Sequence, residues 1–167
     1  MTTEADISVA AARLLDACRL RGIKVATAES CTGGLLAAAL VDMAGSSDVF
    51  ERGVVSYSNA AKETMLGVPR AVLQCYGAVS REAAEAMAAG ALANSPAQLV
   101  VAVTGIAGPT GGSADKPVGL VHFAAAARDG RLIHREQRFG EIGRRQVRLR
   151  SVAEALDLLE ALAAGIP

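Results

Sequence analysis

Tryptophan is absent from this chain of 167 residues, and other aromatic side chains are scarce, with three Phe and two Tyr. Proteins that bind single-stranded nucleic acids stack bases on aromatic rings, and proteins that bind duplexes present a large positive field. Here 17 basic residues balance 17 acidic residues, so the formal net charge is zero. The composition therefore argues against a nucleic acid as the partner.

Long apolar runs are missing as well, since none approaches the roughly 18 residues that a membrane-spanning helix needs. The first residues, MTTEAD, are acidic and lack the basic segment of a secretory signal peptide. Hydrophobic residues make up 51% of the chain and charged residues 20%, which excludes disorder. We expect a single globular domain over residues 1–167, located in the cytoplasm and without contact with a membrane.

Cysteine is sparse, and Cys18, Cys31 and Cys75 stand far apart and odd in number. This set matches neither a disulfide framework nor the spacing of a zinc site. We expect reduced thiols that are mostly buried.

Positive charge is unevenly distributed along the chain. Residues 128–150 hold eight Arg and three acidic residues, a local excess of five positive charges that the rest of the chain cancels. A small anionic ligand suits a local excess of this size. The alternative is an ordinary solvated face rich in arginine.

Helical and extended patterns alternate along the chain. Apolar spacing, turn residues and capping residues predict helices over residues 4–20, 32–43, 59–66, 80–94 and 143–163, with Asn59 as a helix cap. Strands are predicted over residues 24–29, 53–57, 99–103, 118–126 and 132–139. Asp129 and Gly130 predict a hairpin turn between the last two strands. This order favours an α/β fold, a three-layer α/β/α sandwich with a mixed sheet.

A serine stands where the first predicted strand meets the second helix, in residues 28–34 (AESCTGG). Open α/β sheets bind ligands at this position. Ser30 is a candidate nucleophile, and unpaired N–H groups of Thr32, Gly33 and Gly34 are candidate oxyanion donors. The alternative is a capping serine followed by glycines that allow close packing, and Cys31 is either a rival nucleophile or a buried thiol.

A nucleophilic serine needs a base, and the chain offers few. His122 and His134 both lie inside the predicted hairpin strands, and arginine holds its proton too tightly. Lysine is a base when its pKa is lowered by burial. Lys62 lies just past the end of the second strand, so it reaches Ser30 if the two strands are neighbours, whereas Lys24 begins its strand at the opposite edge.

A loop rich in glycine follows the central strand, in residues 104–113 (TGIAGPTGGS). It lacks the Lys-Ser/Thr ending of a phosphate-binding P-loop, so binding of a nucleoside triphosphate is not expected. Thr104, Gly105 and the residues after them either line a nucleotide or form a mobile surface loop.

Taken together, these segments resemble the C-terminal domain of the CinA family, whose active members are nicotinamide-nucleotide amidases. The matching segments are residues 28–34, 44–47 (AGSS), 50–53 (FERG), 57–59 (YSN) with Lys62, 77–80 (GAVS), 104–109 (TGIAGP), 112–113 (GS) and 116–119 (KPVG). The resemblance implies a mostly parallel, mixed sheet of five strands, a homodimer, and no metal or cofactor. It also implies the stand-alone form of the domain.

The same resemblance implies an activity and a set of roles. The carboxamide of nicotinamide mononucleotide would be hydrolysed to nicotinate mononucleotide and ammonia. Ser30 would attack the amide and Lys62 would act as its base. Tyr57 and Asn59 would orient the lysine or the substrate, while Thr104 and Gly105 would line the nucleotide.

The basic motif of the family is altered in this chain. Residues 142–148 (IGRRQVR) place Arg144 and Arg148 on the two family arginines, but Gly143 stands where the family has an acid. The resemblance implies that Arg144 and Arg148 hold the phosphate, and residues four apart share one helix face, so both can reach one anion. The alternative, which the change at Gly143 leaves open, is that Arg145 takes the place of Arg144. Two other classes stay open, a non-catalytic nucleotide-binding domain and a regulatory domain linked to competence or DNA damage.

Overall fold

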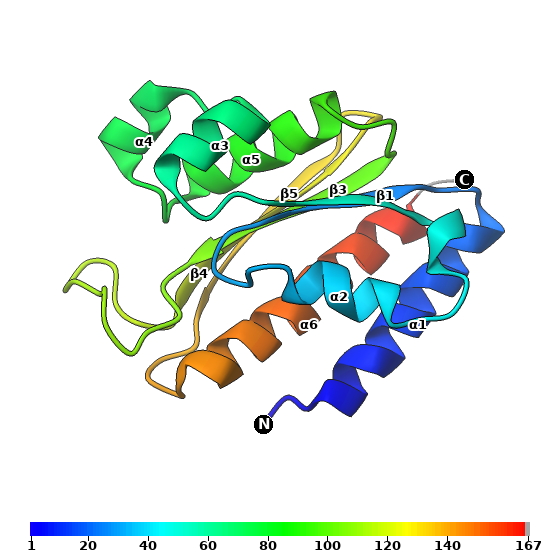
Figure 1. Cartoon of the computed structure of the whole chain (residues 1–167), viewed down its shortest axis with the longest axis horizontal. Helices are drawn as coiled ribbons and strands as arrows, with labels where there is room; N and C mark the ends of the chain where they lie inside the picture. The colour runs from blue at the N-terminus through cyan, green and yellow to red at the C-terminus, as the bar shows by residue number, and fades with distance from the viewer. Residues whose placement is uncertain (166–167) are drawn as a thin grey trace.

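A central sheet organises the computed structural model, which describes residues 1–165 (Figure 1). Within these residues the sheet has five strands in the order β2-β1-β3-β4-β5. Their bounds are β1 Val25–Glu29, β2 Phe50–Val55, β3 Leu99–Gly105, β4 Leu120–Ala127 and β5 Leu132–Arg138. β1 is parallel to both β2 and β3, whereas β4 is antiparallel to β3 and to β5. The predicted mixed sheet is confirmed, and four of its described strands run in one direction.

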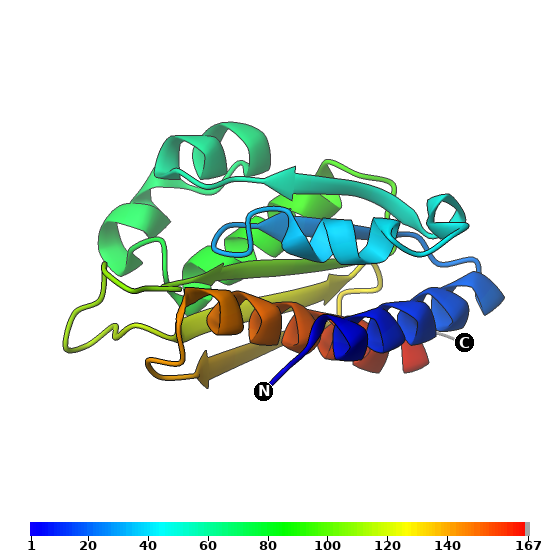
Figure 2. The same ribbon diagram turned by 60° about the horizontal axis from the view of Figure 1, so that its bottom comes forward.

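Helices cover both faces of this sheet, as the alternating pattern predicts. Their bounds are α1 Glu4–Leu20, α2 Leu35–Val41, α3 Asn59–Leu66, α4 Arg70–Tyr76, α5 Arg81–Ala93 and α6 Arg144–Ala164, with a short 3-10 turn, η1, at Ser46–Asp48. Helices α1, α2 and α6 lie on one face and α3, α4 and α5 on the other (Figure 1). Figure 2 shows the turned view, in which α1 and α6 run side by side in front of the sheet. The three-layer sandwich is confirmed.

Strand β3 lies at the centre of the core and is buried on both faces. Leu99, Val101 and Val103 pack into the cluster formed with α1 and α6. Val100 and Ala102 point the other way, into the cluster formed with α5. Burial on both sides explains why this strand is a continuous apolar run without alternation.

Three parallel strands bring the ends of three functional segments to one edge of the sheet. Ser30 follows β1, Tyr57 follows β2, and loop 106–119 follows β3. Backbone pairing continues past the strand ends, because the Ser56 N–H donates to the Glu29 carbonyl at 2.8 Å and the Ser30 N–H to the Val103 carbonyl at 2.9 Å. The peptide group between Glu29 and Ser30 is therefore held by both neighbouring segments.

Three local predictions differ from the structure. Helix α3 is capped by Ser58, whose Oγ accepts the Ala61 N–H at 3.0 Å, so the prediction of Asn59 as the cap is wrong. Helix α4 was not predicted, because its seven residues bury only Leu73 and its N-cap residue makes no side-chain hydrogen bond. Strand β2 begins at residue 50 rather than 53, since an edge strand with exposed residues lacks a clear alternation.

Candidate active site

A lysine and a serine meet at the carboxyl edge of the sheet. Lys62 Nζ lies 2.9 Å from Ser30 Oγ. Both side chains are buried, with 1% of Lys62 and 8% of Ser30 exposed. The pairing predicted from the two strand ends is confirmed in position, and β1 and β2 are the neighbours that it requires.

The surroundings of the Lys62 amine favour its neutral form. Burial lowers the pKa of Lys62 from its ordinary value of 10.5, because an ammonium group loses its hydration there. A thiolate at Cys31 would raise it again, but burial raises the pKa of that thiol to about 12, so it stays protonated near neutral pH. Lys62 is thereby suited to accept a proton.

Two carbonyls orient the amine toward the serine. Lys62 Nζ donates to the Ser56 carbonyl at 2.9 Å and to the Tyr57 carbonyl at 3.3 Å. A neutral amine has two N–H groups and one lone pair. With the two N–H groups on these carbonyls, the lone pair faces the Ser30 hydroxyl, which is the geometry of a general base.

The turn after Ser30 is fixed by a buried carboxylate. Glu29 is fully buried, and its two oxygens accept the N–H groups of Gly34 at 3.0 Å, Leu36 at 3.1 Å and Ala37 at 2.9 Å. These are the donors at the start of α2, which a helix cannot satisfy by itself. Glu29 therefore neutralises the amino end of α2 and anchors the segment that carries the nucleophile.

This anchoring corrects the predicted set of oxyanion donors. The Gly34 N–H donates to the Glu29 carboxylate, and the Gly33 N–H donates to the Ser30 carbonyl at 3.0 Å. The prediction that both groups are unpaired is wrong, because the chain supplies its own acceptors. Of the three predicted donors, the Thr32 N–H remains as the candidate. The sequence did contain a sign that Glu29 caps α2, because it is an acidic residue at the end of an otherwise buried strand.

A cavity of about 210 Å³ opens beside the pair. It is lined by Ser30, Cys31, Tyr57, Lys62, Ala78, Val79, Thr104, Gly105, Ala107 and Arg144. The structure thus brings Tyr57, Thr104, Gly105 and Arg144 to the cavity, as predicted. Asn59 is exposed and lies outside the lining, so it is not placed to orient the reactive groups.

The two predicted phosphate ligands take different places. Arg144 borders the cavity, and its guanidinium donates to the Gly108 carbonyl at 2.9 Å and to the Tyr57 hydroxyl at 3.1 Å. Arg148 lies one turn further along α6 and donates to the Thr32 carbonyl at 2.7 Å. Although both arginines lie on one face of α6, they do not point at the same group, because Arg148 is directed at the turn that carries the nucleophile. Sequence reasoning missed this contact.

The two histidines lie away from the pair, and of the three cysteines only Cys31 lines the cavity in the described residues. His122 and His134, on β4 and β5, contact each other, with Nδ1 and Nε2 3.1 Å apart, and burial lowers the pKa of both. Cys18 and Cys31 are buried free thiols, whereas Cys75 is free but exposed. Within residues 1–165, no group of three or more His, Cys, Asp or Glu is placed to hold a metal ion. No helix in that part of the chain is both long and apolar enough to cross a bilayer.

The fold and the site together define an α/β protein with a buried serine–lysine pair of the kind that serves nucleophilic acyl transfer. The family model of the CinA C-terminal domain matches residues 7–163. The chain belongs to the CinA C-terminal domain family.

Relatives and solved structures agree with this assignment. Nicotinamide-nucleotide amidohydrolase PncC of Enterobacter agglomerans is 50% identical over 140 residues, which cover 84% of this chain and 85% of that protein. A CinA-like protein of Mycobacterium tuberculosis is 49% identical over 148 residues, which are 89% of this chain but 34% of that protein. The chain therefore spans about a third of the CinA-like relative. The crystal structure of competence/damage inducible protein CihA from Agrobacterium tumefaciens superposes with a TM-score of 0.93, at 55% identity, covering 94% of this chain and 95% of that one.

Proposed function

We propose that this chain is a nicotinamide-nucleotide amidase, which hydrolyses the carboxamide of nicotinamide mononucleotide to nicotinate mononucleotide and ammonia. The observation that carries the proposal is the buried contact between Lys62 and Ser30, set in a cavity that Arg144 borders. The relative from Enterobacter agglomerans, which bears the name of this activity, supports the choice of substrate.

The first half of the reaction forms an ester. Ser30 Oγ attacks the carboxamide carbon while neutral Lys62 takes the hydroxyl proton. The N–H of Thr32 stabilises the oxyanion that develops on the former carbonyl oxygen. As this tetrahedral intermediate collapses, the C–N bond breaks and the Lys62 ammonium returns its proton to the leaving nitrogen, which departs as ammonia.

The second half consumes the ester. Water attacks the acyl carbon of the Ser30 ester, and Lys62, neutral again, removes a proton from that water. The C–O bond to Ser30 then breaks, the serine regains its proton from Lys62, and nicotinate mononucleotide leaves. One group thus serves as base and acid in turn, and no cofactor is required.

Recognition of the nucleotide is assigned to the border of the cavity. Thr104 and Gly105 line the nucleotide, and the Arg144 guanidinium holds the phosphate, because its planar fork matches the oxygens of that anion. Arg148 instead acts on the nucleophile turn through the Thr32 carbonyl. Tyr57 supports both parts, since its hydroxyl accepts from Arg144 and its carbonyl from Lys62.

Release of ammonia from nicotinamide mononucleotide tests the proposal. Free nicotinamide and nicotinamide riboside serve as controls that lack the nucleotide or its phosphate, and Ser30→Ala serves as the inactive variant. Ammonia released from the nucleotide by the wild type and not by Ser30→Ala is expected. Binding of the nucleotide without any ammonia would instead favour a non-catalytic nucleotide-binding domain.

We also propose that the protein is a homodimer of one domain per chain that works in the cytoplasm and does not bind nucleic acid. The free thiols support the cytoplasm, the zero net charge argues against nucleic acid, and the homodimer rests on the resemblance to the family. Light scattering after gel filtration measures the oligomeric state. Titration of labelled DNA at low salt measures nucleic-acid affinity, and binding that weakens steeply with salt would contradict the proposal.

A further inference from the structure

One wall of the cavity comes from the junction between α4 and α5, residues 77–80. Ala78 and Val79 belong to the cavity lining. Inside the junction, Ser80 Oγ donates to the Gly77 carbonyl at 2.9 Å and caps α5. From the sheet, Thr104 Oγ1 donates to the Ala78 carbonyl at 2.7 Å.

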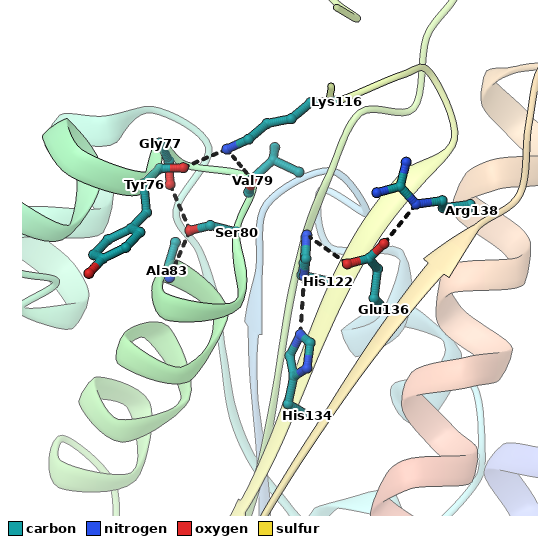
Figure 3. A network of polar contacts seen from close by, with 10 residues as sticks. All are labelled: Tyr76, Gly77, Val79, Ser80, Ala83, Lys116, His122, His134, Glu136 and Arg138. Atoms are coloured by element: carbon teal, nitrogen blue, oxygen red, sulfur yellow. Dashed lines mark hydrogen bonds and ion pairs between the residues drawn. The ribbon is translucent and has the colours of Figure 1, made fainter. Parts of the chain in front are cut away.

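A lysine from a loop distant in the sequence donates hydrogen bonds to the same junction. Figure 3 shows the Lys116 ammonium directed between two carbonyls, and it donates to that of Tyr76 at 2.5 Å and to that of Val79 at 2.7 Å. Tyr76 is the last residue of α4, so its carbonyl lacks an intrahelical partner and carries the negative end of the helix. An ammonium group satisfies both carbonyls at once, because it has three donors and no acceptor.

The loop that carries Lys116 is itself well held. Its base is closed where the Gly119 N–H donates to the Ile106 carbonyl at 2.8 Å. Close to Lys116, the Ser113 N–H donates to the Lys116 carbonyl at 2.8 Å, and Ser113 Oγ accepts the Lys116 N–H at 3.1 Å. Lys116 is therefore presented by an ordered turn.

The same loop also borders the cavity. Ala107 lines the cavity, and the Gly108 carbonyl accepts from Arg144. Lys116 thus ties two parts of the cavity border together, the wall at residues 77–80 and the loop that supports the arginine. It makes no contact with Ser30 or Lys62 in the described residues, and it is absent from the cavity lining.

We propose that Lys116 is a positioning residue of the amidase site, which fixes the Ala78–Val79 wall relative to loop 106–119 and so sets the fit of the nucleotide. The inference rests on the proposed function. Because Lys116 acts on the wall and not on the reactive pair, its loss weakens nucleotide recognition and leaves the intrinsic reactivity of Ser30 unchanged.

The test compares three lysine variants. Lys116→Met keeps the length of the stem and removes the donors, whereas Lys116→Arg keeps a cation with several donors. Lys24→Met is the matched control, because Lys24 Nζ also donates to a backbone carbonyl, that of Ser47 at 3.3 Å, but lies at the opposite edge of the sheet. Each variant is measured for kcat and KM with nicotinamide mononucleotide, and for the rate at which a small sulfonyl fluoride inactivates Ser30.

We expect Lys116→Met to raise KM by about tenfold or more, with kcat changed by less than about threefold and inactivation by the reagent within about twofold of wild type. The KM of Lys116→Arg should lie between those of Lys116→Met and wild type, and the KM of Lys24→Met should equal that of wild type. An unchanged KM in Lys116→Met overturns the inference. So does a fall in reagent reactivity that parallels the loss of activity, since it would mark a general structural role.

Hydrogen exchange separates this inference from the proposed function. In Lys116→Met, the backbone amides of residues 77–80 are expected to exchange faster than in wild type, while those of β3 are unchanged. This readout needs no substrate. If wild type releases no ammonia, the proposed function fails, and faster exchange still shows that Lys116 holds the wall. If wild type is active and exchange at residues 77–80 is unaltered, the inference about Lys116 fails alone.

Discussion

Lys62 Nζ lies 2.9 Å from Ser30 Oγ although 32 residues separate the two in the sequence. The contact arises because each residue follows one of two adjacent parallel strands, β1 and β2, whose ends are in register at Glu29 and Val55. The Ser56 N–H extends this pairing by one more hydrogen bond, to the Glu29 carbonyl. Lys62 itself lies in α3, so backbone pairing and the position of that helix together set the separation of the reactive atoms.

Replacement of the serine tests the nucleophile. Ser30→Ala should lower turnover at least ~10³-fold while nucleotide binding persists, since this group forms the covalent bond. Cys31→Ser is the control, because the neighbouring thiol is buried and protonated, and its loss should change the rate far less. Steady-state kinetics and calorimetric binding measure the two effects. A variant at Cys31 that is inactive beside an active Ser30→Ala would reverse the assignment.

Replacement of the lysine by arginine tests the base. Lys62→Arg keeps the positive charge but does not release its proton near neutral pH, so it should be nearly as inactive as Lys62→Met. For wild type, kcat/KM should rise with pH as Lys62 loses its proton, and burial places this rise below the ordinary value of 10.5. A flat profile through this range, or substantial activity of Lys62→Arg, would mean that Lys62 serves only as a charge.

The lowered pKa of Lys62 also makes a prediction about stability. Between the folded and the unfolded pKa, the unfolded chain binds more protons, so stability rises with pH in this window. Below the folded pKa, both states hold the proton and the penalty of burying an ammonium group is fully present. The free energy of unfolding of wild type relative to Lys62→Met should therefore increase from pH 7 toward pH ~10. Urea denaturation at a series of pH values measures this difference, and a constant difference contradicts the prediction.

Glu29 is expected to support both stability and rate. Glu29→Gln replaces one accepting oxygen by an NH₂ group that cannot pair with the N–H groups at the start of α2. Each buried donor left unpaired costs about 1–3 kcal/mol, so the free energy of unfolding should fall by about 2 kcal/mol or more. Displacement of Ser30 should also lower kcat by about tenfold to a hundredfold. Asp42→Asn, at the exposed end of α2, should change neither quantity appreciably.

The arginines of α6 are expected to separate into two kinds. Arg144→Ala should raise KM for the nucleotide by about one to two decades and abolish its preference over the riboside, because charge-assisted contacts to phosphate are lost. Arg148→Ala should lower kcat more than it raises KM, since Arg148 holds the Thr32 carbonyl. Arg145→Ala is the control, as Arg145 pairs with Glu4 on the surface. If Arg148→Ala also lost the preference for the nucleotide over the riboside, Arg148 would have to be counted as a phosphate ligand after all.

Local signals in the sequence predicted the fold and part of the site. The bounds expected for the helix at residues 59–66 are those of α3, and elimination among the few possible bases led to Lys62. Pairing through the tertiary structure was beyond these signals. The contact of Arg148 with the Thr32 carbonyl and the contacts of Lys116 with the α4–α5 junction join side chains to backbone that is distant in the sequence, which periodicity and spacing do not encode.

Backbone pairing between β1 and β2 has a consequence for divergence within the fold. The distance between neighbouring strands, about 4.8 Å, is common to all sheets, and it sets the spacing between the end of β1, which Ser30 follows, and the end of β2, which leads into the helix that carries Lys62. The groups that border the nucleotide come from other segments, namely residues 77–80, loop 106–119 and the start of α6. Exchange or remodelling of these segments can redirect the same chemistry to another amide without rebuilding the nucleophile.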